Sequence, residues 1–273
     1  MSKKISIITI NFNNKNGLEK TVISVVNQTW KDFEFIVIDG ASTDGSTTVA
    51  DKYQHQLSQY LSEPDHGVYH AMNKAIKRAN GDYLLFLNSG DVLAEPNTLE
   101  KVQKHLDGRF GFYYGDAIYL EPDGEITRTY PDQLSFSFFL AHNLSHQATF
   151  IKRKLFDEVF PYNENYKIVS DWEFFIYAIC KINIPYQHLD QVICKYDVSG
   201  ISSVLTNHKL MHEEREQTIS NYFPLFIDDY KDITALKSKR FQQFLHIKKY
   251  KLGYKVLKAF MSVILIFLPK NKN

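Results

Sequence analysis

The chain has 273 residues, of which 44% are hydrophobic and 23% are charged, and its formal net charge is +1. This composition excludes an intrinsically disordered or fibrous chain, and the length is enough for one domain with a full core plus an appendage. Cys180 and Cys194 are the two cysteines and form no C-x-x-C motif, so neither a disulfide framework nor a zinc site is suggested.

Strand and helix patterns alternate over residues 1–108. Short apolar runs predict strands at Ile5–Ile10, Phe33–Asp39, Leu57–Glu63 and Tyr83–Leu87. Apolar residues at helical spacing predict helices between them, at Gly17–Trp30, Thr47–Leu57 and Val68–Asn80. Strands that alternate with helices through short links indicate a mostly parallel sheet flanked by helices, which is an α/β fold.

Two helix ends carry sequence signals of their own. Gly81 follows the helix predicted at Val68–Asn80, at the place where a C-cap glycine is favoured. Asn97 with Glu100 resembles a capping box and predicts the start of a further helix.

Polar loops follow three of the predicted strands. With right-handed crossovers, the loops after Ile10, Asp39 and Leu87 lie at one edge of the sheet, where α/β proteins bind their ligands. These loops carry Asn11, Asp39, Ser42, Asp44, Asn88 and Asp91. Such a set of polar and acidic side chains suits a nucleotide and its metal ion.

Two common nucleotide motifs are missing from these loops. Gly40–Thr47 resembles a P-loop, but Ser46 stands where the phosphate-binding lysine would be, which argues against a nucleoside triphosphatase. No G-x-G-x-x-G follows the first strand, so a dinucleotide enzyme is not expected either.

In the second half of the domain, the predicted strands and helices follow a different order. The segments Phe112–Leu120 and Glu125–Tyr130 predict an antiparallel hairpin, Gln147–Ile151 a strand, and Ser170–Lys181 a helix. This half is therefore mixed α+β. Asp171 and Glu173 lie at the start of the predicted helix, where carboxylates serve either in catalysis or as helix caps.

The charge is distributed unevenly along the chain. Residues 231–273 contain eleven Lys and Arg against one Asp, whereas the preceding 230 residues contain 21 basic and 30 acidic residues. The apolar run Ala259–Leu268 is about ten residues, and a bilayer span takes roughly twenty. We expect a basic helical tail that either lies on an anionic membrane or packs on the domain. Nucleic acid is not expected, because no surface of interleaved aromatic and basic residues can be recognised.

Five ordered segments together resemble the family 2 glycosyltransferases over about residues 4–205: ISIITINFNN, QTWKDFEFIVIDGASTDGS, SEPDHGVYHAMNKAIKRANGDYLLFLNSGD, HQATFIKRKLF and SDWEFF. The resemblance implies an A-type glycosyltransferase fold and an inverting sugar transfer from a nucleotide-sugar, most often a UDP-sugar, with Mn²⁺ or Mg²⁺. It divides the chain into a glycosyltransferase domain at 1–230, with a nucleotide-sugar half at 1–108 and an acceptor half at 109–230, and a tail at 231–273.

The resemblance also implies roles for individual residues. Asp171 matches the catalytic base, and we expect burial in a pocket to raise its pKa. The donor-binding positions are Thr9, Asn11, Asp39, Asp65, Asn73, Lys74, Asn88 and Ser89. The acceptor-side positions are His146, Gln147, Trp172 and Glu173. Asp91 matches the last residue of the Asp-x-Asp-Asp metal motif, whose other positions are Asn88, Ser89 and Gly90 here, so the motif is incomplete. Gly200-Ile201-Ser202 resembles the loop that closes over the donor.

The expected function is transfer of a sugar to a hydroxyl of a glycan or lipid-linked acceptor in cell-surface polysaccharide synthesis. With no apolar signal segment after Met-Ser-Lys-Lys, the expected location is the cytoplasm, including the inner face of the membrane. One alternative is a non-catalytic nucleotide- or carbohydrate-binding protein descended from a transferase, which the incomplete metal motif would favour. A sugar nucleotidyltransferase is the other, and the Asn-rich loop NFNNKN argues against it.

Overall fold

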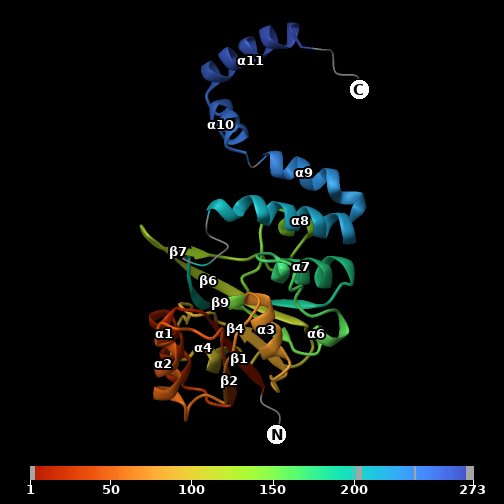
Figure 1. Cartoon of the computed structure of the whole chain (residues 1–273). Coiled ribbons are helices and arrows are strands. Elements are labelled where there is room, and N and C mark those ends of the chain that lie inside the picture. The colour runs from red at the N-terminus through yellow and green to blue at the C-terminus, as the bar shows by residue number, and fades with distance from the viewer. Residues whose placement is uncertain (1–3, 199, 201–204, 237, 269–273) are drawn as a thin grey trace. The chain divides into compact units, whose positions relative to one another are not determined.

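The computed structural model describes residues 4–198, 200, 205–236 and 238–268 (Figure 1). The chain forms two compact units, Met1–Tyr222 and Phe223–Asn273. The strands of the first unit are β1 (Ile5–Asn11), β2 (Phe33–Asp39), β3 (Gln59–Ser62), β4 (Tyr83–Phe86), β5 (Val92–Leu93), β6 (Phe112–Glu121), β7 (Gly124–Arg128), β8 (Thr149–Lys152) and β9 (Tyr186–Asp197).

Helices connect and cover these strands. The α-helices of the first unit are α1 (Lys15–Val26), α2 (Ser46–Tyr53), α3 (Val68–Ile76), α4 (Thr98–Val102), α5 (Phe136–Ala141), α6 (Leu155–Glu158), α7 (Ser170–Ile176) and α8 (His208–Tyr222). Its shorter turns are η1 (His146–Ala148), η2 (Tyr177–Lys181) and η4 (Leu205–Asn207). The predicted alternation of strands and helices is confirmed, with helix ends that differ by a few residues.

The strands of the described chain form one mixed sheet in the order β3-β2-β1-β4-β8-β6-β9-β5, and β7 pairs with β6. β1, β2, β3 and β4 are parallel to one another, whereas β8 runs antiparallel to both β4 and β6. The predicted fold class is therefore confirmed. In the β1–β2 register the last pair is Asn11 with Asp39, so the loops after these strands start side by side.

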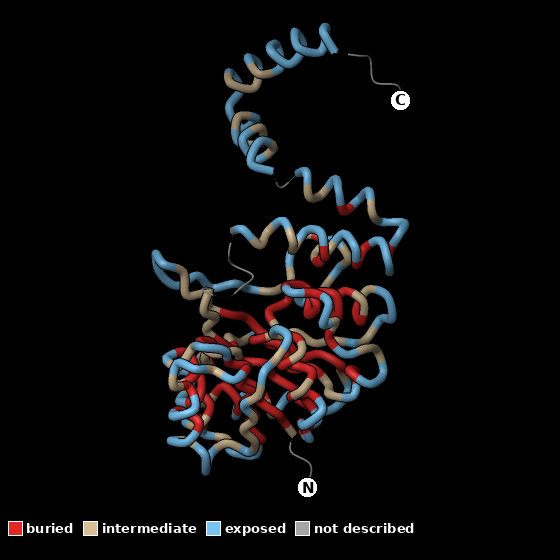
Figure 2. The backbone as a smooth tube through the Cα atoms, in the orientation of Figure 1, coloured by how far each residue is buried: buried red, intermediate tan, exposed pale blue. Residues whose placement is uncertain are grey.

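Apolar side chains on one face of β1 and β2 build the main core. Ile5, Ile7 and Phe35 pack there with Leu18 and other apolar residues of α1, α2 and α4. Full burial of such a side chain contributes about 1.5–3 kcal/mol to folding. Figure 2 shows the buried residues concentrated in the strands of this sheet, which makes the sheet edge a rigid support for the loops that follow it.

The C-cap predicted at Gly81 is wrong, whereas the helix start predicted at Asn97 is confirmed, because α4 begins at Thr98. α3 ends at Ile76, and the Gly81 amide donates instead to Ser6 Oγ at 2.8 Å and Glu34 Oε1 at 3.0 Å. A Cβ on Gly81 would lie 2.5 Å from the Ser6 nitrogen, so this glycine is required by the close approach of the chain to β1. Asn97 occupies the N-cap of α4 without capping it.

The second unit is helical where the structure describes it. It contains η5 (Pro224–Phe226), α9 (Ile227–Leu236), α10 (Lys239–Lys248) and α11 (Lys251–Ile266). Neither α10 nor α11 has a buried residue, and their tube in Figure 2 is pale blue and tan throughout. Among the described residues, no helix combines the length and apolar character that crossing a membrane requires.

We predict that Gly81→Ala lowers the free energy of unfolding of the first unit by about 1–3 kcal/mol, the usual cost of forcing atoms into a packed interior. Urea unfolding followed by circular dichroism would measure the change. Gly253→Ala is the control, because a Cβ there would lie 3.4 Å from its nearest neighbour. Equal stability of the wild type and Gly81→Ala would contradict the tight contact at Ser6.

Candidate active site

A cavity of about 930 Å³ lies beyond the carboxyl ends of β1 and β4, within the first unit. The loop after β4, the β6–β7 hairpin, the segment around η1 and the starts of α3 and α7 all contribute to its lining, together with the end of β9 and part of α8. The cavity therefore joins the two halves of the sequence at the sheet edge where ligand binding is expected.

Asp171 is buried in the first turn of α7 and accepts hydrogen bonds at both carboxylate oxygens. Oδ1 accepts from the Trp172 amide at 2.9 Å and from the Tyr69 hydroxyl at 3.1 Å. Oδ2 accepts from His146 Nδ1 at 2.9 Å and from Asn143 Nδ2 at 3.2 Å. Burial acts to raise the pKa of Asp171, but these bonds, with that from His146 foremost, hold the pKa below its ordinary value. The expectation of a raised pKa is therefore wrong.

Glu214 of α8 positions the segment that enters α7. Its buried carboxylate accepts the backbone N–H groups of Lys167, Ile168 and Val169 at 2.7, 3.0 and 3.1 Å. Three bonds to a charged acceptor compensate the burial of that charge. They fix the backbone immediately before Asp171.

Trp172 holds the same turn from its other side. Its indole Nε1 donates to the Phe139 carbonyl at 2.8 Å, and the Arg215 guanidinium lies 4.8 Å from the ring centroid. Trp172 is among the residues around the cavity, but its indole is fully buried against these partners.

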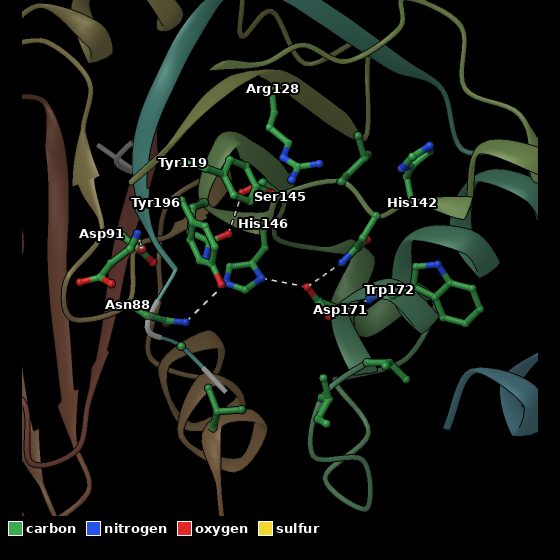
Figure 3. Close-up of a pocket in the computed structure, with 18 of the residues that line it drawn as sticks. Asn88, Asp91, Tyr119, Arg128, His142, Ser145, His146, Asp171, Trp172 and Tyr196 are labelled. Atoms are coloured by element: carbon green, nitrogen blue, oxygen red, sulfur yellow. Dashed lines mark hydrogen bonds and ion pairs between the residues drawn. The ribbon is translucent and has the colours of Figure 1, made fainter. Parts of the chain in front are cut away.

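His146 connects the start of α7 to the loop after β4. Its Nδ1 faces Asp171, and its Nε2 lies 3.4 Å from Asn88 Nδ2, so that the imidazole stands between these two side chains in Figure 3. An ionised carboxylate only accepts hydrogen bonds, so Nδ1 carries the proton that faces Asp171. In the neutral ring, Nε2 then presents its lone pair toward Asn88.

Asp91 is the buried carboxylate at the other end of the cavity. It accepts the Asp197 amide at 3.0 Å, and burial raises its pKa to about 6, against the opposing effects of that amide, His146 and Gln147. Gln147 therefore lies beside Asp91, as does the carboxylate of Asp197, which a Cβ on Gly90 would approach to 3.0 Å.

Few side chains of this site could coordinate a metal ion. The described residues contain no cluster of three or more His, Cys, Asp and Glu side chains arranged to bind a metal. Asp91 and Asp197 are the carboxylates nearest the motif, and Asn88 Oδ1 is buried there without a partner among the described groups. Mg²⁺ is often held by one or two carboxylates plus substrate phosphates. These oxygens fit a cation whose coordination a bound diphosphate completes.

A second polar cluster adjoins the cavity at the ends of β1 and β2. Asp39 accepts from Asn11 Nδ2 and from Ser42 Oγ, each at 2.6 Å, and from Ser62 Oγ at 2.7 Å. Burial acts to raise the pKa of Asp39, and these bonds outweigh burial and lower it. Ser89 Oγ donates to Asn11 Oδ1 at 2.7 Å and so links the cluster to the cavity.

Phe12 is a candidate that the sequence analysis missed. A Cβ on Gly40 would lie 2.5 Å from Asp65 Oδ2 and 3.0 Å from the Phe12 ring, so these two side chains meet over Gly40. The Phe12 ring is 65% exposed, and an exposed ring beside carboxylates can stack on a nucleobase. An aromatic residue within the Asn-rich loop was the available signal.

Seven predicted site residues lie outside the cavity lining: Asn11, Asp39 and Asp65, described above, and four others. Thr9 is buried in β1, and Lys74 pairs with Glu63 at 2.9 Å. The Asn73 amide is engaged by the Tyr162 backbone, donating to its carbonyl at 2.8 Å and accepting its N–H at 3.1 Å. Asn73 thus holds a loop of the second half in place.

Glu173, the fourth of these residues, does not line the cavity. Its side chain is buried near Asn163 and Tyr222, and burial raises its pKa to about 7. Residues on successive positions of a helix point in different directions, which separates Glu173 from Asp171. The placement as an acceptor-side residue is not supported.

Several groups that line the cavity had no sequence signal. Tyr69 and Asn143 both contact Asp171 from distant segments. Arg128 of β7 lies with its guanidinium carbon 4.7 Å from the Tyr119 ring centroid, and Figure 3 places both beside Tyr196. Of the predicted closing loop, Gly200 lines the cavity, whereas Ile201 and Ser202 lie outside the described residues.

Comparison with known proteins places this site in a family. Residues 6–160 match the family described as Glycosyl transferase family 2. A Mycobacterium tuberculosis protein named PGL/p-HBAD biosynthesis glycosyltransferase is 30% identical over 213 residues, which cover 76% of this chain and 82% of that protein. An uncharacterized glycosyltransferase of the same organism is 32% identical over 210 residues, which cover 73% and 77% of the two chains.

Two solved structures have a similar fold. Staphylococcus aureus TarS 1–349 in complex with UDP-GlcNAc has a TM-score of 0.64 at 19% identity, covering 81% of this chain and 67% of that chain. Mannosyltransferase PcManGT from Pyrobaculum calidifontis, in complex with GDP-Man and Mn²⁺, has a TM-score of 0.65 at 15% identity, covering 97% and 81%. At these identities the likeness concerns the fold, and it confirms the predicted A-type architecture.

We predict that Glu173→Gln removes part of the pH dependence of stability. Below about pH 4.5 the wild-type carboxyl is protonated in both states; as the pH rises to about 7, the unfolded chain releases the proton while the folded chain keeps it. The wild type should therefore lose on the order of 1–3 kcal/mol relative to the variant over this range. Urea unfolding at pH 5 and pH 8 would measure the difference.

Glu158→Gln is the control for this measurement, because Glu158 is an exposed residue. Its pH dependence should follow that of the wild type. A constant difference in stability between Glu173→Gln and the wild type at the two pH values would show that Glu173 titrates normally.

Proposed function

The chain belongs to glycosyltransferase family 2, and on that premise we propose that it is an inverting transferase that moves a sugar from a UDP-sugar to a hydroxyl group. The observation that carries the proposal is the position of the Asp171–His146 pair and Asp91 on the lining of one cavity. This transfer requires a group that accepts the proton of the hydroxyl and a group that helps to bind the departing diphosphate.

The Asp171–His146 pair provides the basic side of the reaction. An acceptor hydroxyl is a weak nucleophile, so its proton must be removed as the new bond forms. Attack on the face opposite the leaving diphosphate inverts the anomeric carbon, which requires one base and no covalent intermediate. The buried, hydrogen-bonded pair supplies that single basic unit.

The donor is proposed to extend from the Asp39 cluster to Asp91. Asn11, Asp39 and Asp65 would hold the ribose and base, with the exposed ring of Phe12 as a stacking surface. Asn88 and Ser89 lie between this cluster and the cavity, in position for the diphosphate. Asp91, with Asp197 and the phosphate oxygens, would hold Mn²⁺ or Mg²⁺. Such an ion stabilises the charge of the departing nucleoside diphosphate.

The acceptor is proposed to enter from the β6–β7 hairpin side. There Tyr119, Tyr130, Tyr196 and Phe138 line the cavity. Aromatic rings offer apolar faces with polar tips, which suits the faces of sugar rings. This wall supports a glycan or lipid-linked acceptor, which we propose is extended in the synthesis of cell-surface polysaccharide.

The second unit is proposed to contact the inner face of an anionic membrane. Along α11 an exposed stripe is formed by Leu252, Val256, Phe260, Val263 and Phe267, whose exposed fractions lie between 53% and 82%. Lys251, Lys255 and Lys258 form an exposed basic stripe on the same helix. An apolar stripe with lysines along the helix is typical of helices that lie in the membrane interface.

A non-catalytic binding protein is the alternative. Asn88 and Gly90, which stand in the metal motif where family members carry carboxylates, favour it. Such a protein would bind a nucleotide-sugar without turnover, and substitution of Asp171 would leave its function unchanged.

We predict that the protein releases nucleoside diphosphate from one donor in a panel of UDP- and GDP-sugars assayed with Mn²⁺, Mg²⁺ or EDTA. EDTA and Asp91→Ala should each abolish release. Asp171→Asn should lower the rate at least about 100-fold, the scale of a general base, with donor affinity unchanged in a thermal shift assay. Turnover by Asp171→Asn at the wild-type rate, or donor binding without any turnover, would favour the non-catalytic alternative.

We predict that the full chain co-sediments with vesicles that contain phosphatidylserine and that Lys255→Gln with Lys258→Gln weakens this binding. Each lysine near the surface contributes about 1 kcal/mol, so the double variant should bind roughly 30-fold more weakly. The control is Lys20→Gln with Lys104→Gln, two exposed lysines of the first unit. The membrane contact would be refuted if the two double variants co-sedimented equally. It would also be refuted if the wild type co-sedimented with vesicles of phosphatidylcholine alone as strongly as with vesicles that contain phosphatidylserine.

A further inference from the structure

We propose that the acceptor carries an oxyanion, either a phosphate or a carboxylate group, and that the guanidinium of Arg128 binds it. The inference rests on the proposed function, because it names the class of acceptor for the proposed transfer. Three features of the first unit support it: the position of Arg128 on the cavity face of the hairpin, the absence of a carboxylate partner for it among the described residues, and the carboxylates elsewhere on the lining.

Arg128 belongs to the face of the β6–β7 hairpin that lines the cavity. It pairs with Ala117 across the hairpin. Tyr119 lies two residues further along β6 on the same face, where it is the diagonal neighbour of Arg128. Tyr119, Ile126 and Arg128 all line the cavity. The alternation of side chains along the two strands therefore directs the guanidinium toward the cavity.

Aromatic rings orient this guanidinium. Its carbon lies 4.7 Å from the Tyr119 ring centroid, and the centroids of the Tyr119 and Tyr196 rings lie 4.9 Å apart in an edge-to-face arrangement. An aromatic ring attracts a cation without neutralising its charge. The stack therefore holds the long side chain of Arg128 in place and leaves its positive charge available to a ligand.

Arg128 forms no ion pair with a carboxylate in the part of the chain that the structure describes. Glu125, the acidic residue of the same strand, pairs instead with Lys195 at 2.8 Å. A guanidinium carries five N–H donors in a fixed fork, which fits two oxygens of a phosphate or a carboxylate. An oxyanion at this wall of the cavity would therefore be bound by paired, charge-assisted hydrogen bonds.

The charges of the remaining lining give a reason for a cation at this wall. The lining carries the carboxylates of Asp91, Asp171 and Asp197, and the donor diphosphate is proposed to lie beside Asp91. These negative charges repel an anionic acceptor, so that such an acceptor needs a cation where it binds, whereas a neutral acceptor does not. Figure 3 shows Arg128 and Asn88 on opposite sides of His146, which places the cation away from the proposed diphosphate position.

Lys167 and Arg215 are the other basic residues of the lining. The Arg215 guanidinium lies 4.8 Å from the ring centroid of Trp172, which belongs to α7. Lys167 is exposed and precedes α7. Both add positive charge to the lining, which agrees with an anionic acceptor, and Arg128 is placed on the hairpin from whose side the acceptor is proposed to enter.

The test compares acceptors that differ in charge. The donor identified in the panel above is supplied with glucose, glucose 6-phosphate or glucuronic acid, and with the same three compounds of the galactose series. Transfer is measured as diphosphate release above the rate with water, and binding by calorimetric titration of the protein in the presence of nucleoside diphosphate. We expect kcat/KM for at least one charged acceptor to exceed that for its neutral counterpart by about tenfold or more. The phosphate and carboxylate arms show which oxyanion is preferred.

Arg128→Gln should abolish this preference by lowering kcat/KM for the charged acceptor about 10- to 100-fold, mainly through KM, since hydrogen bonds to charged groups have this strength. Arg128→Lys keeps the positive charge and should retain part of the preference. Arg109→Gln is the matched control, because Arg109 also lies over a ring, that of Phe110 at 5.6 Å, but pairs with Asp107 and does not line the cavity. A role of Arg128 in hairpin packing alone would change stability and leave the preference intact.

Three results would overturn the inference. The wild type could neither use nor bind any charged acceptor better than its neutral counterpart, or Arg128→Gln could keep the wild-type preference. Arg128→Gln could also weaken donor binding in a thermal shift assay as much as it weakens use of the acceptor, which would show that Arg128 binds the donor. The proposed function fails separately: if no donor of the panel releases diphosphate, both fail, whereas release with equal use of neutral and charged acceptors refutes the inference alone.

Discussion

The parallel pairing of β1 with β2 and β4 is the constraint on which the site depends. Parallel strands end at the same edge of a sheet, and the β1–β2 register finishes with Asn11 opposite Asp39. The loop after β4 follows at the same edge, where Ser89 bonds to Asn11. Because the strands are buried and cannot slip without exposing their apolar faces, three loops from distant parts of the sequence are held within hydrogen-bonding distance.

Buried carboxylates hold backbone segments in place within each half of the domain. Glu34 accepts the backbone amides of Asn80 and Gly81 and the hydroxyl of Ser6, and Glu214 accepts the amides before Asp171. A buried charge is costly unless it is fully bonded. Each carboxylate therefore specifies the conformation of the chain that surrounds it, and Glu214 in particular specifies where α7 begins.

The pKa values of the two buried carboxylates of the cavity, Asp91 and Asp171, are shifted in opposite directions. Burial with few donors leaves Asp91 with a pKa of about 6, whereas four donors keep the pKa of Asp171 low. Asp91 therefore gains most from a positive partner, which a metal ion between it and a diphosphate would provide. Asp171 already has its partner in His146, and the pair keeps its shared proton between carboxylate and ring.

The sequence by itself determined the alternation of strands and helices, the polar strand ends and the family resemblance. These depend on local periodicity and on residue types that follow one another along the chain. The tertiary structure decided which side chains meet. His146 lies 25 residues from Asp171 and Tyr69 lies 102 residues from it, and the hydrogen bonds from these two side chains help to reverse the expected direction of the Asp171 pKa shift. The same packing buries Glu173 beside Asn163 and Tyr222 and occupies the Asn73 amide with the Tyr162 backbone. Side-chain direction and hydrogen-bond partners are set by such long-range contacts, which no local pattern encodes.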